Sequence, residues 1–159
     1  MALPNPIRTF LTKVEVLKDL ETKVQELMAQ HEAKRPLWFP SDLLGPRPGE
    51  DPDAHYAALR TRARGIPDPA RAALALNMLT EEGLPHFHRL LATHLGDDSH
   101  WQAWNHLWTA EEDRHGVILH DYLHEARIVN QRHLEAMQFD YLRAGFTPGQ
   151  RLTWKCGVG

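Results

Sequence analysis

Apolar residues in this sequence recur at every third or fourth position, over segments long enough for several helical turns, and they do not alternate with polar residues. The stripe that shows this best contains Trp101, Trp104, Trp108, Leu119 and Tyr122. A helix repeats every ~3.6 residues and a strand every two, so the pattern predicts amphipathic helices and no sheet. Long helices joined by short turns favour an all-α bundle.

Five helices are expected, over residues 7–28, 53–64, 69–94, a long segment after the turn at 96–99, and 130–144. Pro85 is expected to kink the third helix, because proline interrupts the hydrogen-bond ladder. Asp68 is predicted to be the N-cap of that helix, and Gly145 the C-terminal cap of the last. Five prolines between residues 36 and 52 predict an ordered loop that apolar side chains anchor.

Length and composition indicate one soluble domain over residues 1–159. The chain has 42% hydrophobic residues, enough for a real core, but no run that approaches the ~18 apolar residues of a membrane span. A net charge of -3 without basic runs gives no reason to expect a nucleic acid partner. The single cysteine, Cys156, cannot form an internal disulfide, and residues 1–10 read as neither a signal nor a transit peptide. We therefore expect a cytoplasmic protein.

The pair Glu112 and His115 is the sharpest chemical feature of the sequence. Residues three apart on a helix lie on the same side, ~4.5 Å apart along the axis, so both can bind one ion. The two belong to the apolar stripe, which predicts that they face the contact surface of the helix. Burying a carboxylate costs several kcal/mol unless a partner compensates, and a metal is the partner that Glu and His share. The alternative is structural: Glu112 paired with Arg114, and His115 as a core histidine.

Glu81 supplies a second acid, on a different predicted helix and among the apolar residues Met78 and Leu84. One Glu from one helix and a Glu-x-x-His from another make half of the ligand set of ferritin-like di-iron bundles. The combination predicts a metal site formed by Glu81, Glu112 and His115.

Two longer stretches relate the chain to a known family. Residues 77–85 read NMLTEEGLP, and residues 108–116 read WTAEEDRHG. Both resemble signature stretches of the soluble acyl-[acyl-carrier-protein] desaturases, and the similarity extends over residues 7–148. The resemblance implies a ferritin-like helical bundle whose iron ligands come from these two stretches.

By the family's pattern, the iron ligands are Glu81, Glu112 and His115, whereas Glu82 and Glu111 are their neighbours. The implied cofactor is a di-iron centre, with two irons in each complete active site, that takes electrons from a ferredoxin-type donor and activates dioxygen. The implied reaction introduces a cis double bond into an acyl chain in fatty acid biosynthesis. An acyl carrier protein carries that chain, and the enzyme is expected to be a homodimer.

The second half of the family's ligand set, a further Glu and a further Glu-x-x-His, is not found in these 159 residues. The nearest spacing, Asp121 with His124, begins nine residues after Glu112 and so half a turn out of phase. Residues 151–159 do not follow the family's pattern either. We therefore expect a bundle truncated after the first half of the di-iron core, with an atypical tail.

Three interpretations stay open. The first is a desaturase domain whose activity needs the missing half, so that this chain alone is an inactive fragment. The second is a noncatalytic helical remnant that dimerises through the surface that the absent helices would cover. The third is a ferritin-like iron-binding protein without desaturase activity. Among further residues, only His88 is expected to approach Glu81, and Trp101, Trp104 and Trp108 are interpreted as core rather than as an electron path.

Overall fold

The computed structural model describes residues 12–95 and 99–145. Its helices are α1 (Lys13–Lys34), α2 (Pro40–Leu44), α3 (Pro52–Ala63), α4 (Asp68–Glu81), α5 (Leu84–Leu95), α6 (Ser99–Ala126) and α7 (Gln131–Ala144). These residues contain no strand, which confirms the all-α prediction. None of the described helices combines the length and the apolar character that crossing a membrane requires. The tail at 151–159 lies outside the described residues.

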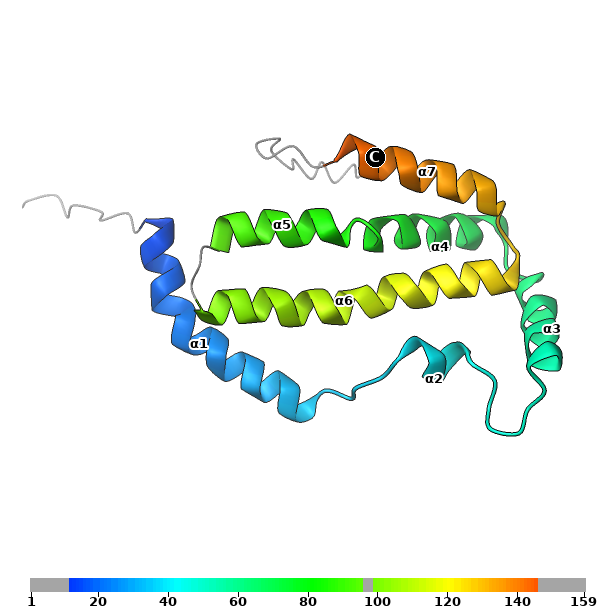
Figure 1. Cartoon of the computed structure of the whole chain (residues 1–159), viewed down its shortest axis with the longest axis horizontal. Coiled ribbons are helices and arrows are strands. Elements are labelled where there is room, and N and C mark those ends of the chain that lie inside the picture. The colour runs from blue at the N-terminus through cyan, green and yellow to red at the C-terminus, as the bar shows by residue number, and fades with distance from the viewer. Residues whose placement is uncertain (1–11, 96–98, 146–159) are drawn as a thin grey trace, which may run out of the picture.

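The long helix α6 is the centre of the arrangement, and α1 to α5 all pack against it. Along one side of α6, α4 and α5 lie end to end, and α7 lies beyond them (Figure 1). Along the other side, α1, α2 and α3 follow one another (Figure 1). The two helices that carry the predicted ligands, α4 and α6, are therefore direct neighbours.

A small apolar core joins α4, α6 and α7. Its buried members are Met78, Leu79, Leu123 and Leu134. Burial of a side chain of this size contributes ~1.5–3 kcal/mol through its removal from water. Met78 lies about one turn before Glu81 in α4, so the packing of this core also fixes the backbone of the predicted ligand.

The helix predicted over residues 69–94 is broken into α4 and α5, not merely kinked. Pro85 has no N–H to donate to the carbonyl of Glu81, four residues earlier. Between the two helices, the N–H of Gly83 donates to the carbonyl of Thr80 at 3.1 Å. A Cβ on Gly83 would lie 2.8 Å from Cε1 of Tyr141 in α7, so the missing side chain makes room for α7.

Helix bounds differ from the prediction most clearly at α1 and at the start of α4. Helix α1 extends beyond the predicted end to Lys34, and it starts after Thr12, whose hydroxyl accepts the N–H of Glu15 at 3.3 Å. Helix α4 begins at Asp68 itself, with Pro67 as the N-cap. The prediction placed the cap one residue late because Asp is the commoner capping residue.

The proline-rich loop at 36–52 contains a helical turn that was not predicted. Helix α2 starts at Pro40, a position where a helix needs no N–H donor. The side chain of Asp42 accepts the N–H of Phe39 at 2.8 Å and so stabilises this start. At the other end of the chain, Gly145 caps α7 as predicted, with a φ of 64° that favours glycine.

Candidate metal centre

Helices α4 and α6 bring together the three residues predicted to bind metal. Glu81, Glu112 and His115 each offer one ligand atom, and these atoms all lie within 4.8 Å of one another. Glu81 is the last residue of α4, and the other two lie one turn apart in α6. A Cβ on Gly116 would lie 3.5 Å from the Cβ of Glu81, so this glycine lets the two helices approach closely at the site.

The charges at these three positions would favour a cation over none. Burial raises the pKa of Glu81, the negative charge of Glu112 raises it further, and His115 opposes the shift. Within α6, Nδ1 of His115 lies 2.7 Å from Oε2 of Glu112. Two carboxylates held together without a cation repel each other, and a bound metal ion would reverse this cost. Carboxylate oxygen with imidazole nitrogen is a donor set that iron accepts in helical bundles.

The triad, meaning Glu81, Glu112 and His115, is more open than predicted. The side chain of Glu112 is 28% exposed and that of His115 is 45% exposed, so they do not face a dry contact surface. The helical period correctly grouped them with the apolar stripe, but it cannot say whether another element covers that stripe. The structure therefore presents three ligands that could hold an ion with coordination positions left open.

A tryptophan from the loop before α2 covers part of the triad. The ring of Trp38 stacks on His115, with centroids 5.8 Å apart and planes 17° from parallel. Arg114 donates from Nη1 to the carbonyl of Trp38 at 2.7 Å, and its guanidinium lies 5.0 Å from the indole centroid. Arg114 thus holds the loop rather than pairing with Glu112, contrary to the structural alternative. Trp38 therefore restrains the imidazole, and sequence reasoning missed this contact because 76 positions separate Trp38 from Arg114, which holds it in place.

Glu111, although adjacent to Glu112, is directed to α1. Its carboxylate lies 2.8 Å from Nε2 of His31 and forms an ion pair with Arg35. Of these two adjacent acids, only Glu112 therefore belongs to the triad. The contact also ties the end of α1 to the position next to a predicted ligand.

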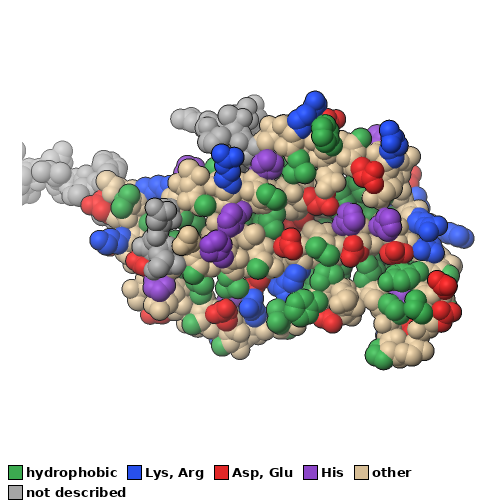
Figure 2. Space-filling model, viewed as in Figure 1, with side chains coloured by type: hydrophobic (Ala, Val, Ile, Leu, Met, Phe, Trp, Pro, Cys, Tyr) green, Lys and Arg blue, Asp and Glu red, His purple; other side chains and the backbone are tan. Residues whose placement is uncertain are grey.

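Glu81 also lines a pocket of about 670 Å³, together with other polar residues. His88 lines it beside Glu81, but its Nδ1 lies 2.7 Å from the hydroxyl of Thr109, so His88 is not part of the triad. Asp121 lies 3.2 Å from Nδ1 of His120 and is likewise outside the triad, as its phase predicted. Figure 2 shows histidine and acidic side chains interspersed over the middle of the face drawn there.

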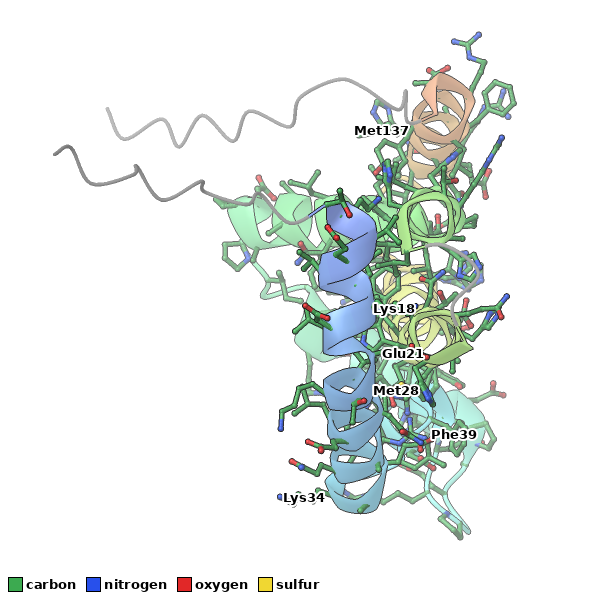
Figure 3. All side chains as sticks on the ribbon, turned by 90° about the vertical axis from the view of Figure 1, so that its left-hand side faces the viewer. Lys18, Glu21, Met28, Lys34, Phe39 and Met137 are labelled. Carbon is green, nitrogen blue, oxygen red and sulfur yellow. The ribbon has the colours of Figure 1, made fainter. Side chains whose placement is uncertain are left out.

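The tryptophan stripe is not core. Trp101, Trp104 and Trp108 are half-buried and line an apolar groove of about 470 Å³ between α6 and α1. From α1, Val24, Leu27 and Met28 line the same groove. Figure 3 shows Met28 on the side of α1 that faces α6. Leu107, His31 and Glu111 complete the lining of the groove, and Glu111 is the residue before Glu112 of the triad.

Comparison with known proteins points to the same family that the two sequence stretches resemble. The sequence profile of the fatty acid desaturase family matches residues 12–155. A proposed acyl-[acyl-carrier-protein] desaturase of Mycobacterium tuberculosis, DesA1, is 35% identical over 144 residues, which cover 88% of this chain and 42% of that protein. The chloroplastic stearoyl-[acyl-carrier-protein] 9-desaturase of Ricinus communis is 34% identical over 145 residues, covering 86% of this chain and 36% of that enzyme. The chain thus spans less than half the length of these relatives.

Proposed function

Because this chain belongs to the fatty acid desaturase family, we propose that it contributes half of the metal site of an acyl-[acyl-carrier-protein] desaturase. The proposed reaction is the oxygen-dependent introduction of a cis double bond into an acyl chain in fatty acid biosynthesis. One observation carries the proposal: Glu81, Glu112 and His115, from two helices, converge within reach of a common ion. These residues belong to the two stretches in which the family resemblance implies iron ligands.

In this proposal, residues of this chain bind the metal and orient one of its ligands. Glu81, Glu112 and His115 would hold iron, and Trp38 with Arg114 fixes the imidazole for it. Bound iron would supply the oxidising power that removes hydrogen from unactivated carbon. The part of the site described here holds three ligands, so a bridged pair of irons needs further donors from outside the triad.

Partners and location are proposed for the complete protein. The names of the relatives specify acyl groups on an acyl carrier protein, and we propose the same carrier here. A ferredoxin-type electron donor, a centre with two irons and a homodimeric state belong to the same proposal. We also propose a cytoplasmic location, whereas the Ricinus communis relative is named chloroplastic.

Iron binding tests the metal site. Anaerobic titration with Fe(II), followed by calorimetry, should show a saturable site that Glu112→Gln abolishes. Glu135→Gln is the matched control, because Glu135 is an exposed acid on α7 and its loss should leave the affinity unchanged. A chain that binds no iron, or binds it equally well after Glu112→Gln, would rule out this site.

Turnover tests the reaction. With an acyl carrier protein loaded with a saturated acyl chain, a reducing system and oxygen, the iron-loaded protein should yield an unsaturated acyl product by mass spectrometry. The half-exposed triad and the open groove favour a second candidate, iron binding without desaturation. Saturable iron binding with no unsaturated product would support that candidate instead.

A further inference from the structure

We propose that one end of the molecule is the docking surface for the acyl carrier protein, whose acidic side chains meet arginines of this chain. The inference rests on the proposed function and adds the place where the carrier binds. At this end α3 and α6 finish, and α4 and α7 begin (Figure 1). Four exposed residues there are called the arginine surface below: Arg62, Arg64, Arg127 and Arg132.

Positive charge is concentrated at this end. Besides the arginine surface, Arg60 and Arg71 lie there, whereas lysine does not occur between residues 35 and 154. Figure 2 shows Lys or Arg side chains at the right-hand end of the face drawn there. The chain as a whole has a net charge of -3, so the positive charge is local. A compact basic surface on an otherwise acidic chain fits a compact acidic protein better than a long polyanion such as DNA.

Two of these arginines are engaged within the chain, and the arginine surface is not. Arg60 donates from Nε and Nη2 to the carbonyl and the carboxylate of Glu125, both at 3.0 Å. Arg71 donates to the carbonyls of Ile66 and Arg64 at 2.8 and 3.1 Å. The arginine surface forms no ion pair with any residue in the described ranges, 12–95 and 99–145. Its guanidinium groups are therefore available for a partner's carboxylates, which they can bind through two parallel hydrogen bonds.

The backbone at Arg127 is an independent observation in favour of this surface. Helix α6 ends at Ala126, and Arg127 follows it with a φ of 52°. Glycine is the usual residue in this left-handed conformation after a helix, because a Cβ is strained there. Within residues 12–95 and 99–145, the other residues with a positive φ are both glycines. The chain thus keeps a charged side chain at a position where glycine would fit the backbone better.

The arginine surface lies within reach of the metal centre. Arg127 follows His115 by 12 residues, which corresponds to ~18 Å along the axis of α6. The pocket of about 670 Å³ that Glu81 lines extends along α6 from Thr109 to Asp121, five residues before the helix ends. A carrier docked on the arginine surface can therefore extend its acyl chain along α6 toward the triad.

Calorimetry of carrier binding to the 159-residue chain tests the proposal. The probe is an acidic acyl carrier protein loaded with a stearoyl chain. The same carrier without the acyl chain should compete with it, because the contact is between two protein surfaces. The affinity should fall as salt is added, since exposed charges are screened.

A charge reversal at Arg132 identifies the surface. Arg132→Glu should weaken carrier binding about tenfold, because it replaces an attraction with a repulsion between like charges. Arg143→Glu is the matched control, since it makes the same change on an exposed residue in the last turn of α7. It should alter the affinity less than about twofold, because it lies ~16 Å further along the helix.

Arg127→Gly separates the charge of this residue from its effect on folding. Glycine accepts the left-handed conformation, so the melting temperature should be unchanged or higher. Carrier binding should nevertheless weaken about fivefold. A purely structural role would give the reverse result, a lower melting temperature with unaltered carrier affinity. The affinity for Fe(II) should be the same in all these variants, because none of them changes the triad.

The contrary results are distinguishable. Equal carrier affinity for Arg132→Glu and the unaltered chain, or no carrier binding at all, would overturn the inference while the Fe(II) titration decides separately on the metal site. If an acidic [2Fe–2S] ferredoxin lost affinity for Arg132→Glu and the carrier did not, the surface would belong to the electron donor. Tighter binding of a DNA duplex than of the carrier at equal salt would likewise overturn it.

Discussion

Replacing Trp38 with alanine should weaken metal binding without unfolding the protein. The change removes the ring that stacks on His115 and that lies under the guanidinium of Arg114. A stacked aromatic pair contributes ~0.5–1.5 kcal/mol, and the 45% exposure of His115 favours the lower part of this range. About 0.5 kcal/mol less restraint on the imidazole corresponds to about twofold weaker metal binding.

The assay is an anaerobic Co(II) titration followed by visible absorption, because cobalt reports its ligands directly. Trp38→Phe should recover part of the affinity, since it keeps an aromatic face over the imidazole. Leu37→Ala is the matched control, because Leu37 is the neighbouring loop residue and is 61% exposed. Equal cobalt affinity for Trp38→Ala and the unaltered chain would refute the idea that this ring positions His115.

Three further predictions concern the approach of the helices and the start of α1. Gly116→Ala should keep metal binding, because its Cβ would lie at an ordinary contact distance of 3.5 Å from the Cβ of Glu81. The larger side chain of Gly116→Val should separate α4 from α6 and weaken Co(II) binding more than tenfold. Gly83→Ala places a Cβ 2.8 Å from the Tyr141 ring and should lower the free energy of unfolding in urea by ~1–3 kcal/mol. Tyr141→Leu in the same chain should recover most of that loss, and no recovery would locate the strain elsewhere. Hydrogen bonds from the backbone and side chain of Thr12 lower the pKa of Glu15 below its ordinary 4.5, so the ionised form stabilises the start of α1. This contribution is present above pH 4.5 and is lost as the pH falls through the lowered value, so the protection of the first-turn amides against exchange should fall there in the unaltered chain but not in Glu15→Gln, which has no carboxylate to titrate.

The sequence was sufficient for the all-helical class, for the long helix α6 and for the grouping of the candidate residues. Apolar periodicity located the long helix α6, and the spacing of Glu112 and His115 placed both on one side of it. Glu81 could be added because the known ligand set requires an acid from a second helix. The inferences about α6 depend on short separations along the chain, where helical geometry fixes the distances, whereas Glu81 was added from the ligand set.

What the sequence could not supply depends on contacts between distant segments. Gly83, between α4 and α5, lies against the ring of Tyr141 from α7, a contact between segments far apart in the sequence. The stack of Trp38 on His115 likewise joins a loop to α6. Periodicity showed that the tryptophans share a face, but only the position of α1 decides that they line an open groove.

The break after Glu81 has an electrostatic consequence. Helix α4 ends at this residue, and Pro85 cannot donate to its carbonyl, whose oxygen would lie 3.9 Å from a Cβ on Gly116 in α6. The aligned peptide dipoles of a helix sum to a macrodipole with about half a negative charge at the C-terminal end. A cation in the triad would therefore also be attracted by the negative end of α4, by ~0.3–1 kcal/mol. If α4 continued without a break, its negative end would lie beyond the site and this attraction would be lost.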